Sequence, residues 1–183
     1  MKTTFLFTSL ICCTIFLSSK LFAQRVSDDS LQTNSSNEGH RFPEIKGYMG
    51  LVHPLYTWSS DGNQPNFRDY YLVGNPWGIN IWKSKKVGLS FEFTPFIRTN
   101  DKTSKLSNFL FHPGILYRLG HDFVLVGRVA YETSGRFGFT PILNKVFWRG
   151  KETNLFAAIL LPTRFGNNQA PSLTIAFQFG IGF

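Results

Sequence analysis

Hydrophobic and polar residues alternate strictly over residues 172–183, which read SLTIAFQFGIGF. Large apolar residues occupy every odd position, and small or polar residues occupy every even position. A period of two predicts a β-strand that has one apolar face and one small or polar face. Strands of transmembrane β-barrels show this pattern, because alternate residues face the lipid and the lumen.

Similar alternation recurs along the chain and predicts eight strands, at residues 46–58, 70–84, 85–99, 107–119, 122–133, 136–149, 153–165 and 172–183. Each segment is at least as long as the ~9–11 residues that a tilted strand needs to cross a bilayer. Short turns and longer polar loops alternate between the strands, although the short connection at 133–135 interrupts this order. The predicted fold class is all-β, an eight-stranded antiparallel up-and-down transmembrane β-barrel.

Two other barrel classes fit the pattern less well. A soluble exported barrel needs a polar exterior, whereas the apolar face here has no further sheet or helix to cover it, which favours lipid as its partner. A general porin needs a wide channel, and side chains fill an eight-stranded barrel.

The N-terminal region predicts export across a membrane. Residues 1–23 have a basic start, an apolar middle and a small residue near the end, as secretory signal peptides do. We expect three segments: a signal peptide at 1–23, a flexible periplasmic leader at 24–45 and the barrel at 46–183. Both cysteines, Cys12 and Cys13, fall within the signal peptide, so the mature chain has no thiol for a disulfide or a zinc site.

Charge is sparse and scattered. The whole chain carries +8, and removal of Lys2 and Lys20 with the signal peptide leaves 17 basic against 11 acidic residues, or +6. No Lys/Arg-rich face is evident, so nucleic acid is not an expected partner. Basic residues near the longer loops could instead meet the phosphates of lipopolysaccharide, or simply be solvated.

Over residues 46–183, the chain resembles the small OmpA/OmpX-type outer-membrane barrels of Gram-negative bacteria. The resemblance rests on the strand number, the loop asymmetry, the signal peptide and the terminal aromatic residue. The resemblance implies a location in the outer membrane, among its lipid and lipopolysaccharide. It also implies that Phe179, Ile181 and Phe183 form a C-terminal signal for the barrel-assembly machinery. It identifies no specific function.

In each predicted strand, the small or polar positions of the alternation are expected to face the lumen. The charged and histidine residues at these positions predict a network inside the lumen, formed by Glu92, His112, Arg118, Arg128, Glu132 and Arg164. Charges in a narrow barrel must pair, because an unpaired buried charge is strongly penalised. Folding the strands about residues 101–102 places Glu92 opposite His112. A histidine oriented by a carboxylate is also part of a hydrolytic triad, for which Ser90 is a candidate nucleophile. The histidines are dispersed, so neither a metal nor a cofactor is expected.

Six predicted strands each contain one proline: Pro54, Pro76, Pro95, Pro113, Pro141 and Pro162. Proline cannot donate to the strand ladder, so these residues indicate either bulges that set curvature or a lateral opening for a lipid chain. The favoured function is a non-catalytic outer-membrane protein with a structural or surface-interaction role. The alternatives are a lipid-modifying hydrolase or acyltransferase, and a narrow barrel for a small ligand. The oligomeric state is left open.

Overall fold

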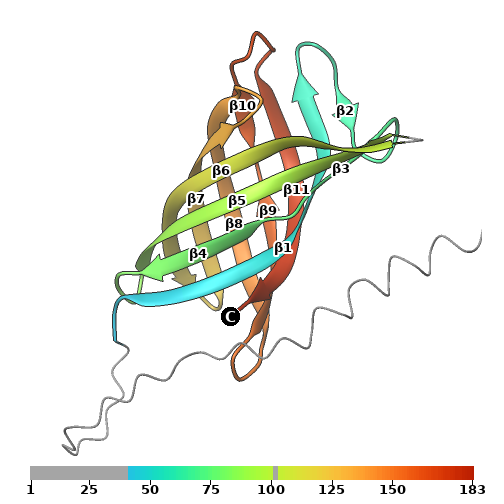
Figure 1. Ribbon diagram of the computed structural model, residues 1–183. Helices are drawn as coiled ribbons and strands as arrows, with labels where there is room; N and C mark the ends of the chain where they lie inside the picture. The colour runs from blue at the N-terminus through green and yellow to red at the C-terminus, as the bar shows by residue number, and fades with distance from the viewer. Residues whose placement is uncertain (1–40, 101–102) are drawn as a thin grey trace, which may run out of the picture. The chain divides into compact units, whose positions relative to one another are not determined.

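The computed structural model describes residues 41–100 and 103–183, whose strands form one antiparallel sheet closed on itself (Figure 1). The strands are β1 (Glu44–Ser59), β2 (Gln64–Pro65), β3 (Tyr71–Gly74), β4 (Trp77–Trp82), β5 (Val87–Asn100), β6 (Thr103–Gly120), β7 (Phe123–Glu132), β8 (Phe137–Arg149), β9 (Asn154–Leu160), β10 (Thr163–Phe165) and β11 (Ser172–Gly182). The predicted signal peptide and residues 24–40 of the predicted leader lie outside the described residues. Within the described part of the chain, no helix is long and apolar enough to cross a membrane.

The sheet is a ring of eight strands. β3 and β4 form one interrupted strand, as do β9 and β10, while β2 pairs with β1 alone and stays outside the ring. Consecutive ring strands pair with each other, and β1 closes the ring by pairing with β11 from Tyr48–Gly182 to Ser59–Ser172. The predicted all-β, eight-stranded up-and-down barrel is confirmed. The first strand begins at Glu44, two residues before the predicted start of the barrel.

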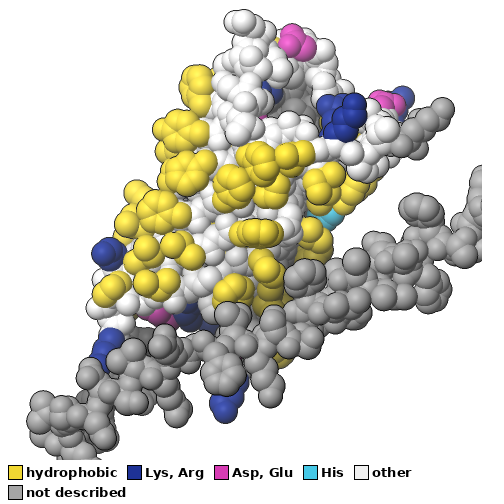
Figure 2. All heavy atoms as spheres, viewed as in Figure 1, with side chains coloured by type: hydrophobic (Ala, Val, Ile, Leu, Met, Phe, Trp, Pro, Cys, Tyr) yellow, Lys and Arg dark blue, Asp and Glu magenta, His cyan; other side chains and the backbone are white. Residues whose placement is uncertain are grey.

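Alternate residues face opposite sides of the sheet, as the sequence pattern predicts. On β5, Phe91 and Phe93 are 39% and 45% exposed on the outside, whereas the inward-facing Ser90 is fully buried. Apolar side chains cover much of the outer surface (Figure 2). Because no protein element covers this belt within the described residues, lipid is the environment that removes it from water.

The ring closes tightly beside the last residue. The backbone N–H of Gly47 donates to the carbonyl of Phe183 at 2.8 Å, and the N–H of Phe183 donates back at 2.9 Å. The Phe183 ring lies directly over the Cα of Gly47, where any added Cβ would overlap it. Glycine at position 47 therefore leaves room for the Phe183 ring at this rim.

The prolines occur largely at irregularities that preserve backbone pairing. Pro76 and Pro162 lie at the breaks between β3 and β4 and between β9 and β10, and register shifts lie beside Pro54 and Pro95. The carbonyls of Pro76, Pro95, Pro141 and Pro162 accept hydrogen bonds from N–H groups of neighbouring strands at 2.8–3.0 Å. Of the two interpretations of the prolines, these contacts favour bulges that set curvature and not an opening in the barrel wall.

Side chains bridge the weakest seam of the ring, between β1 and β3, where Tyr71 bonds His53 at 2.9 Å and Asn66 makes three further hydrogen bonds. β1 and β3 share a single paired position, Val52 with Gly74. Beyond it, the buried Asn66 donates to the carbonyls of Pro54 and Leu72 at 2.7 and 2.8 Å and accepts from the Leu72 N–H at 2.8 Å. The amide of Asn66 thus replaces the missing ladder between these two strands.

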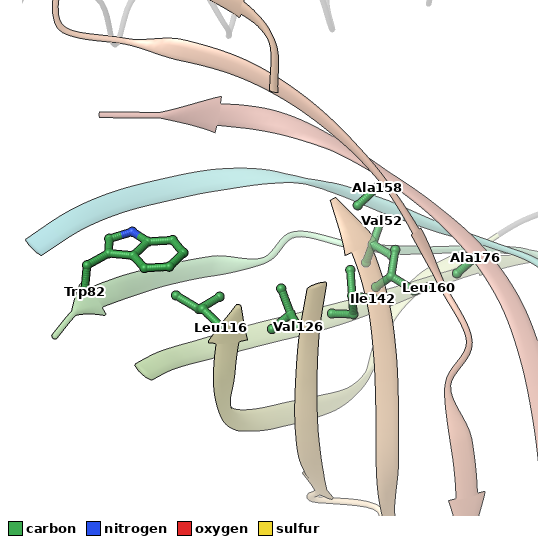
Figure 3. Packing of buried hydrophobic residues seen from close by; sticks show 8 residues of the cluster. All are labelled: Val52, Trp82, Leu116, Val126, Ile142, Ala158, Leu160 and Ala176. Carbon is green, nitrogen blue, oxygen red and sulfur yellow. The ribbon is translucent and has the colours of Figure 1, made fainter. Parts of the chain in front are cut away.

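Apolar side chains fill much of the interior (Figure 3). The cluster takes residues from seven of the eight ring strands: Val52, Trp82, Leu116, Val126, Ile142, Ala158, Leu160 and Ala176. Leu116, Val126 and Leu160 project inward from β6, β7 and β9. The interior is therefore a packed core that surrounds and orients the polar residues described next.

Candidate functional site

The centre of the lumen holds a buried ion pair between Glu92 on β5 and Arg128 on β7. Arg128 Nη1 lies 2.6 Å from Glu92 Oε2, and the two side chains are only 5% and 3% exposed. Tyr48 on β1 donates to Glu92 Oε2 at 2.8 Å and accepts from Arg128 Nη2 at 2.8 Å. Burial of this kind is tolerated because the charges are paired and hydrogen-bonded.

His112 extends this cluster, and its predicted position opposite Glu92 is confirmed. The two residues are register partners on β5 and β6, with His112 Nδ1 3.1 Å from Glu92 Oε1. The other ring nitrogen, Nε2, lies 2.9 Å from the hydroxyl of Thr140 on β8. His112 therefore joins a carboxylate to a hydroxyl across three strands.

Thr140 connects the first cluster to a second ion pair. Arg164 on β10 donates from Nη1 to Thr140 Oγ1 at 3.1 Å and from Nε to Glu132 Oε1 at 2.7 Å. Because Arg164 can only donate, the Thr140 hydroxyl proton is available to His112 Nε2. This assignment places the histidine proton on Nδ1, from which it is donated to Glu92.

The resulting lumen network spans the barrel. Its members include Tyr48, Ser90, Glu92, Thr94, His112, Arg128, Glu132, Thr140 and Arg164. β1 and β7 are four places apart in the ring of eight, so the Tyr48–Arg128 hydrogen bond crosses its diameter. Two carboxylates balance two guanidinium groups, which leaves the network neutral with an uncharged His112.

Cavities lie on both sides of the network. One, of about 120 Å³, is lined by Tyr48 and Arg128 and faces the rim that carries the short turns. The other, of about 200 Å³, is lined by Glu132 and Arg164 and faces the rim with the longer loops. Network residues thus form the floor of each cavity and separate one from the other.

The structure brings together five of the six predicted network residues and places the sixth apart. Arg118 instead pairs with Glu44 at 3.2 Å and stacks over the Trp82 ring at 3.7 Å, near the short-turn rim. The reason is distance, because six residues along a strand separate it from His112 by roughly 20 Å. Tyr48 and Thr140 were not predicted to belong to the network, since neither carries a charge or a motif.

Ser90 does not lie within hydrogen-bond reach of His112 in the structure. Its hydroxyl accepts from Arg128 Nη2 at 3.0 Å, and the hydroxyl on His112 is that of Thr140. Glu92, His112 and Thr140 thus form a carboxylate–imidazole–hydroxyl series, the arrangement that activates nucleophiles in hydrolases. Thr140 is fully buried, however, and its oxygen already accepts from Arg164.

The short-turn rim carries a separate, exposed ion pair. Arg149 donates from Nε and Nη2 to Asp122 Oδ1 at 3.1 and 2.6 Å. This hydrogen bonding by the guanidinium lowers the pKa of Asp122 below its ordinary value. Over the described residues, no group of three or more His, Cys, Asp or Glu is arranged to hold a metal ion.

The chain is similar to solved structures of transmembrane β-barrels. The attachment invasion locus protein Ail of Yersinia pestis is 10% identical, with a TM-score of 0.51 over 77% of this chain and 99% of Ail. A de novo designed transmembrane β-barrel is 11% identical, with a TM-score of 0.46 over 78% of this chain and 97% of the design. The outer-membrane protein OprG of Pseudomonas aeruginosa is 12% identical, with a TM-score of 0.37 over 75% of this chain and 92% of OprG.

No protein-family model matches the chain, and no curated protein sequence matches it. At this level of identity, the likeness to Ail supports the fold and leaves the function to be argued from the side chains. The chain has the architecture of the small outer-membrane barrels, as its strand pattern predicts.

The lumen ion pair yields a test of stability. Replacing Arg128 by Met leaves the buried Glu92 carboxylate without its charge partner and should destabilise the barrel by about 3–5 kcal/mol. Adding Glu92→Gln should restore much of the loss, because the uncompensated charge is removed. Urea unfolding in lipid vesicles, followed by tryptophan fluorescence and by the gel shift of unheated samples, measures both changes.

The half-exposed rim pair is the matched control. Arg118→Met, with or without Glu44→Gln, should cost no more than ~1 kcal/mol, as surface ion pairs do. An Arg128→Met variant as stable as the Arg118→Met variant would contradict a structural role for the lumen pair.

Proposed function

We propose that this protein is a non-catalytic integral protein of the outer membrane, whose barrel is closed and whose role is structural or exerted through its outer surface. The observation that carries the proposal is the neutral lumen network between the two cavities. In this proposal, residues 1–23 direct export and are cleaved, and the short-turn rim faces the periplasm.

A closed lumen follows from the dimensions of the barrel and its contents. Eight strands enclose an interior that side chains can fill. Here the apolar cluster fills much of it, and Tyr48, Glu92 and Arg128 cross the remaining width. Glu92 accepts hydrogen bonds from Tyr48, Thr94 and His112, and Arg128 Nη2 donates to Tyr48 and Ser90. These contacts hold the side chains in place, which argues against a role as an open pore.

The exterior suits permanent residence in lipid. The apolar belt faces outward, and the first and last strands pair to close the sheet of the described residues into a ring. The partners we propose are therefore outer-membrane lipid and lipopolysaccharide, together with the barrel-assembly machinery during insertion. Phe179, Ile181 and Phe183 remain the proposed assembly signal.

The hydrolase or acyltransferase alternative has a specific geometry in its favour, the Glu92–His112–Thr140 series. A nucleophile must touch its substrate, and Thr140 has no exposed surface. The Thr140 oxygen also accepts a hydrogen bond from Arg164 Nη1 at 3.1 Å, which a reaction at this oxygen would have to break. We therefore favour a network that stabilises the lumen over one that transforms a lipid.

A conductance experiment tests the closed lumen. The mature protein in planar bilayers should give no stable current steps, because the network separates the two cavities. Removing both partners with Glu92→Ala and Arg128→Ala should connect these cavities and allow ion leakage. The rim variant with Glu44→Ala and Arg118→Ala removes the same residue types elsewhere and should remain silent. Steady opening of the wild-type protein would show that the lumen is a conduit.

Mass spectrometry of envelope lipids tests the absence of catalysis. Cells with the wild-type protein, without it, or with His112→Ala or Thr140→Val should have identical lipid profiles. A gain or loss of one acyl chain that requires both His112 and Thr140 would overturn the non-catalytic proposal and establish a lipid-modifying enzyme. Equal amounts of folded barrel, judged by heat-dependent gel mobility, are the control for expression.

A further inference from the structure

The cavity on the long-loop side, here called the outer cup, has an excess of positive charge. Arg98, Arg136 and Arg164 line it, with Glu132 as the one carboxylate among the described lining residues. Glu132 is already occupied, because it accepts from Arg164, Asn108 and Ser134 at 2.7–2.9 Å. Arg98 and Arg136 therefore contribute two positive charges without a carboxylate partner among the described residues.

Arg136 is held in place and still has an unused donor. Its Nη2 donates to the carbonyls of Arg164 and Ala170 and to the hydroxyl of Ser172 at 3.0–3.2 Å. Its Nε is buried and has no hydrogen-bond acceptor. Because the Arg136 side chain also lines the outer cup, an anion in the cup can be attracted by its charge and accept a charge-assisted hydrogen bond from it.

Arg98 is fixed by a different contact. Its guanidinium lies 4.0 Å from the centre of the Tyr70 ring. Tyr70 in turn donates to Gln64 at 3.4 Å. This stacking engages the face of the guanidinium and leaves its N–H edges available to an anion.

The size and charge of the outer cup select the ligand. Its volume of about 200 Å³ is below the ~300–1,000 Å³ of sites for drug-sized molecules, so the ligand must be compact. A phosphate monoester carries roughly −1.5 to −2 charges at neutral pH and matches two guanidinium groups, whereas a carboxylate supplies one charge. Hydroxyl and amide groups elsewhere in the lining suit a polar body such as a sugar.

We propose that the outer cup binds a phosphate monoester carried on a compact polar body, with Arg98 and Arg136 as its principal ligands. The phosphate can belong to a free sugar phosphate or to the phosphorylated sugar of a membrane glycolipid. This site is independent of whether the lumen below it is closed.

The test uses the mature protein in micelles of an uncharged detergent, with glucose 6-phosphate as the probe and glucose as the neutral control. Isothermal titration calorimetry should detect glucose 6-phosphate with a Kd of ~1 mM or tighter, and no binding of glucose. Arg98→Gln and Arg136→Gln should each weaken binding about tenfold or more, as loss of a charge-assisted hydrogen bond does. Lys85→Gln removes one charge at the opposite rim and should leave the Kd unchanged.

Arg136 also secures the loop before β11, so its variant could lose structure. The Arg98 side chain stacks on the Tyr70 ring and makes no hydrogen bond or ion pair with the described residues, so its loss should disturb the fold little. The Arg98→Gln variant therefore decides the test if the Arg136→Gln variant fails to shift on the gel. Failure of the wild-type protein to bind, or unchanged affinity in the Arg98→Gln variant, would overturn the proposal.

A second arm identifies the source of the phosphate. The proteins are placed in bilayer nanodiscs that contain a phosphorylated glycolipid, and its ³¹P NMR signal is recorded. A shift that depends on Arg98 and is reversed by glucose 6-phosphate supports the glycolipid as ligand. Binding of glucose 6-phosphate without such a shift supports the free sugar phosphate. Absence of both would exclude the phosphate site.

Discussion

Pairing of buried charge is the constraint on which the rest of this barrel depends. Glu92 lies at the centre of a narrow lumen where water cannot solvate it, so Arg128, Tyr48 and His112 must satisfy its oxygens. Those partners come from three other strands, and their geometry is met only when the ring has the observed register. The network therefore links the position of each strand to the chemistry of the lumen.

The outer wall follows from a second requirement, that backbone groups facing lipid remain paired. Six prolines in the strands would each remove a donor, yet most lie at breaks or register shifts where neighbouring N–H groups still reach their carbonyls. Asn66 fills the remaining gap between β1 and β3 with its amide. Irregularity in the ladder is thus compatible with a wall that has no open edge.

The alternation of residues predicted the strands and which side chains face the lumen. It also predicted the Glu92–His112 pair, because the position of the turn between two antiparallel strands determines which residues lie opposite each other. It did not predict Thr140, since a neutral hydroxyl has no sequence signature. It also grouped Arg118 with the network. Alternation tells which face of the sheet a side chain occupies, but it does not tell how far along the barrel axis that side chain lies. The role of Asn66 was equally hidden, because a polar residue in a loop looks like any other until its tertiary contacts are known.

The proton position on His112 tests the continuous network most directly. In ¹⁵N-histidine NMR spectra of the mature protein in micelles, assigned by comparison with a His112→Gln variant, this ring should be neutral. It should carry a slowly exchanging proton on Nδ1, because Nδ1 donates to Glu92 and Nε2 accepts from Thr140. A proton on Nε2, or a doubly protonated ring in rapid exchange with water, would contradict the network and the closed lumen built on it.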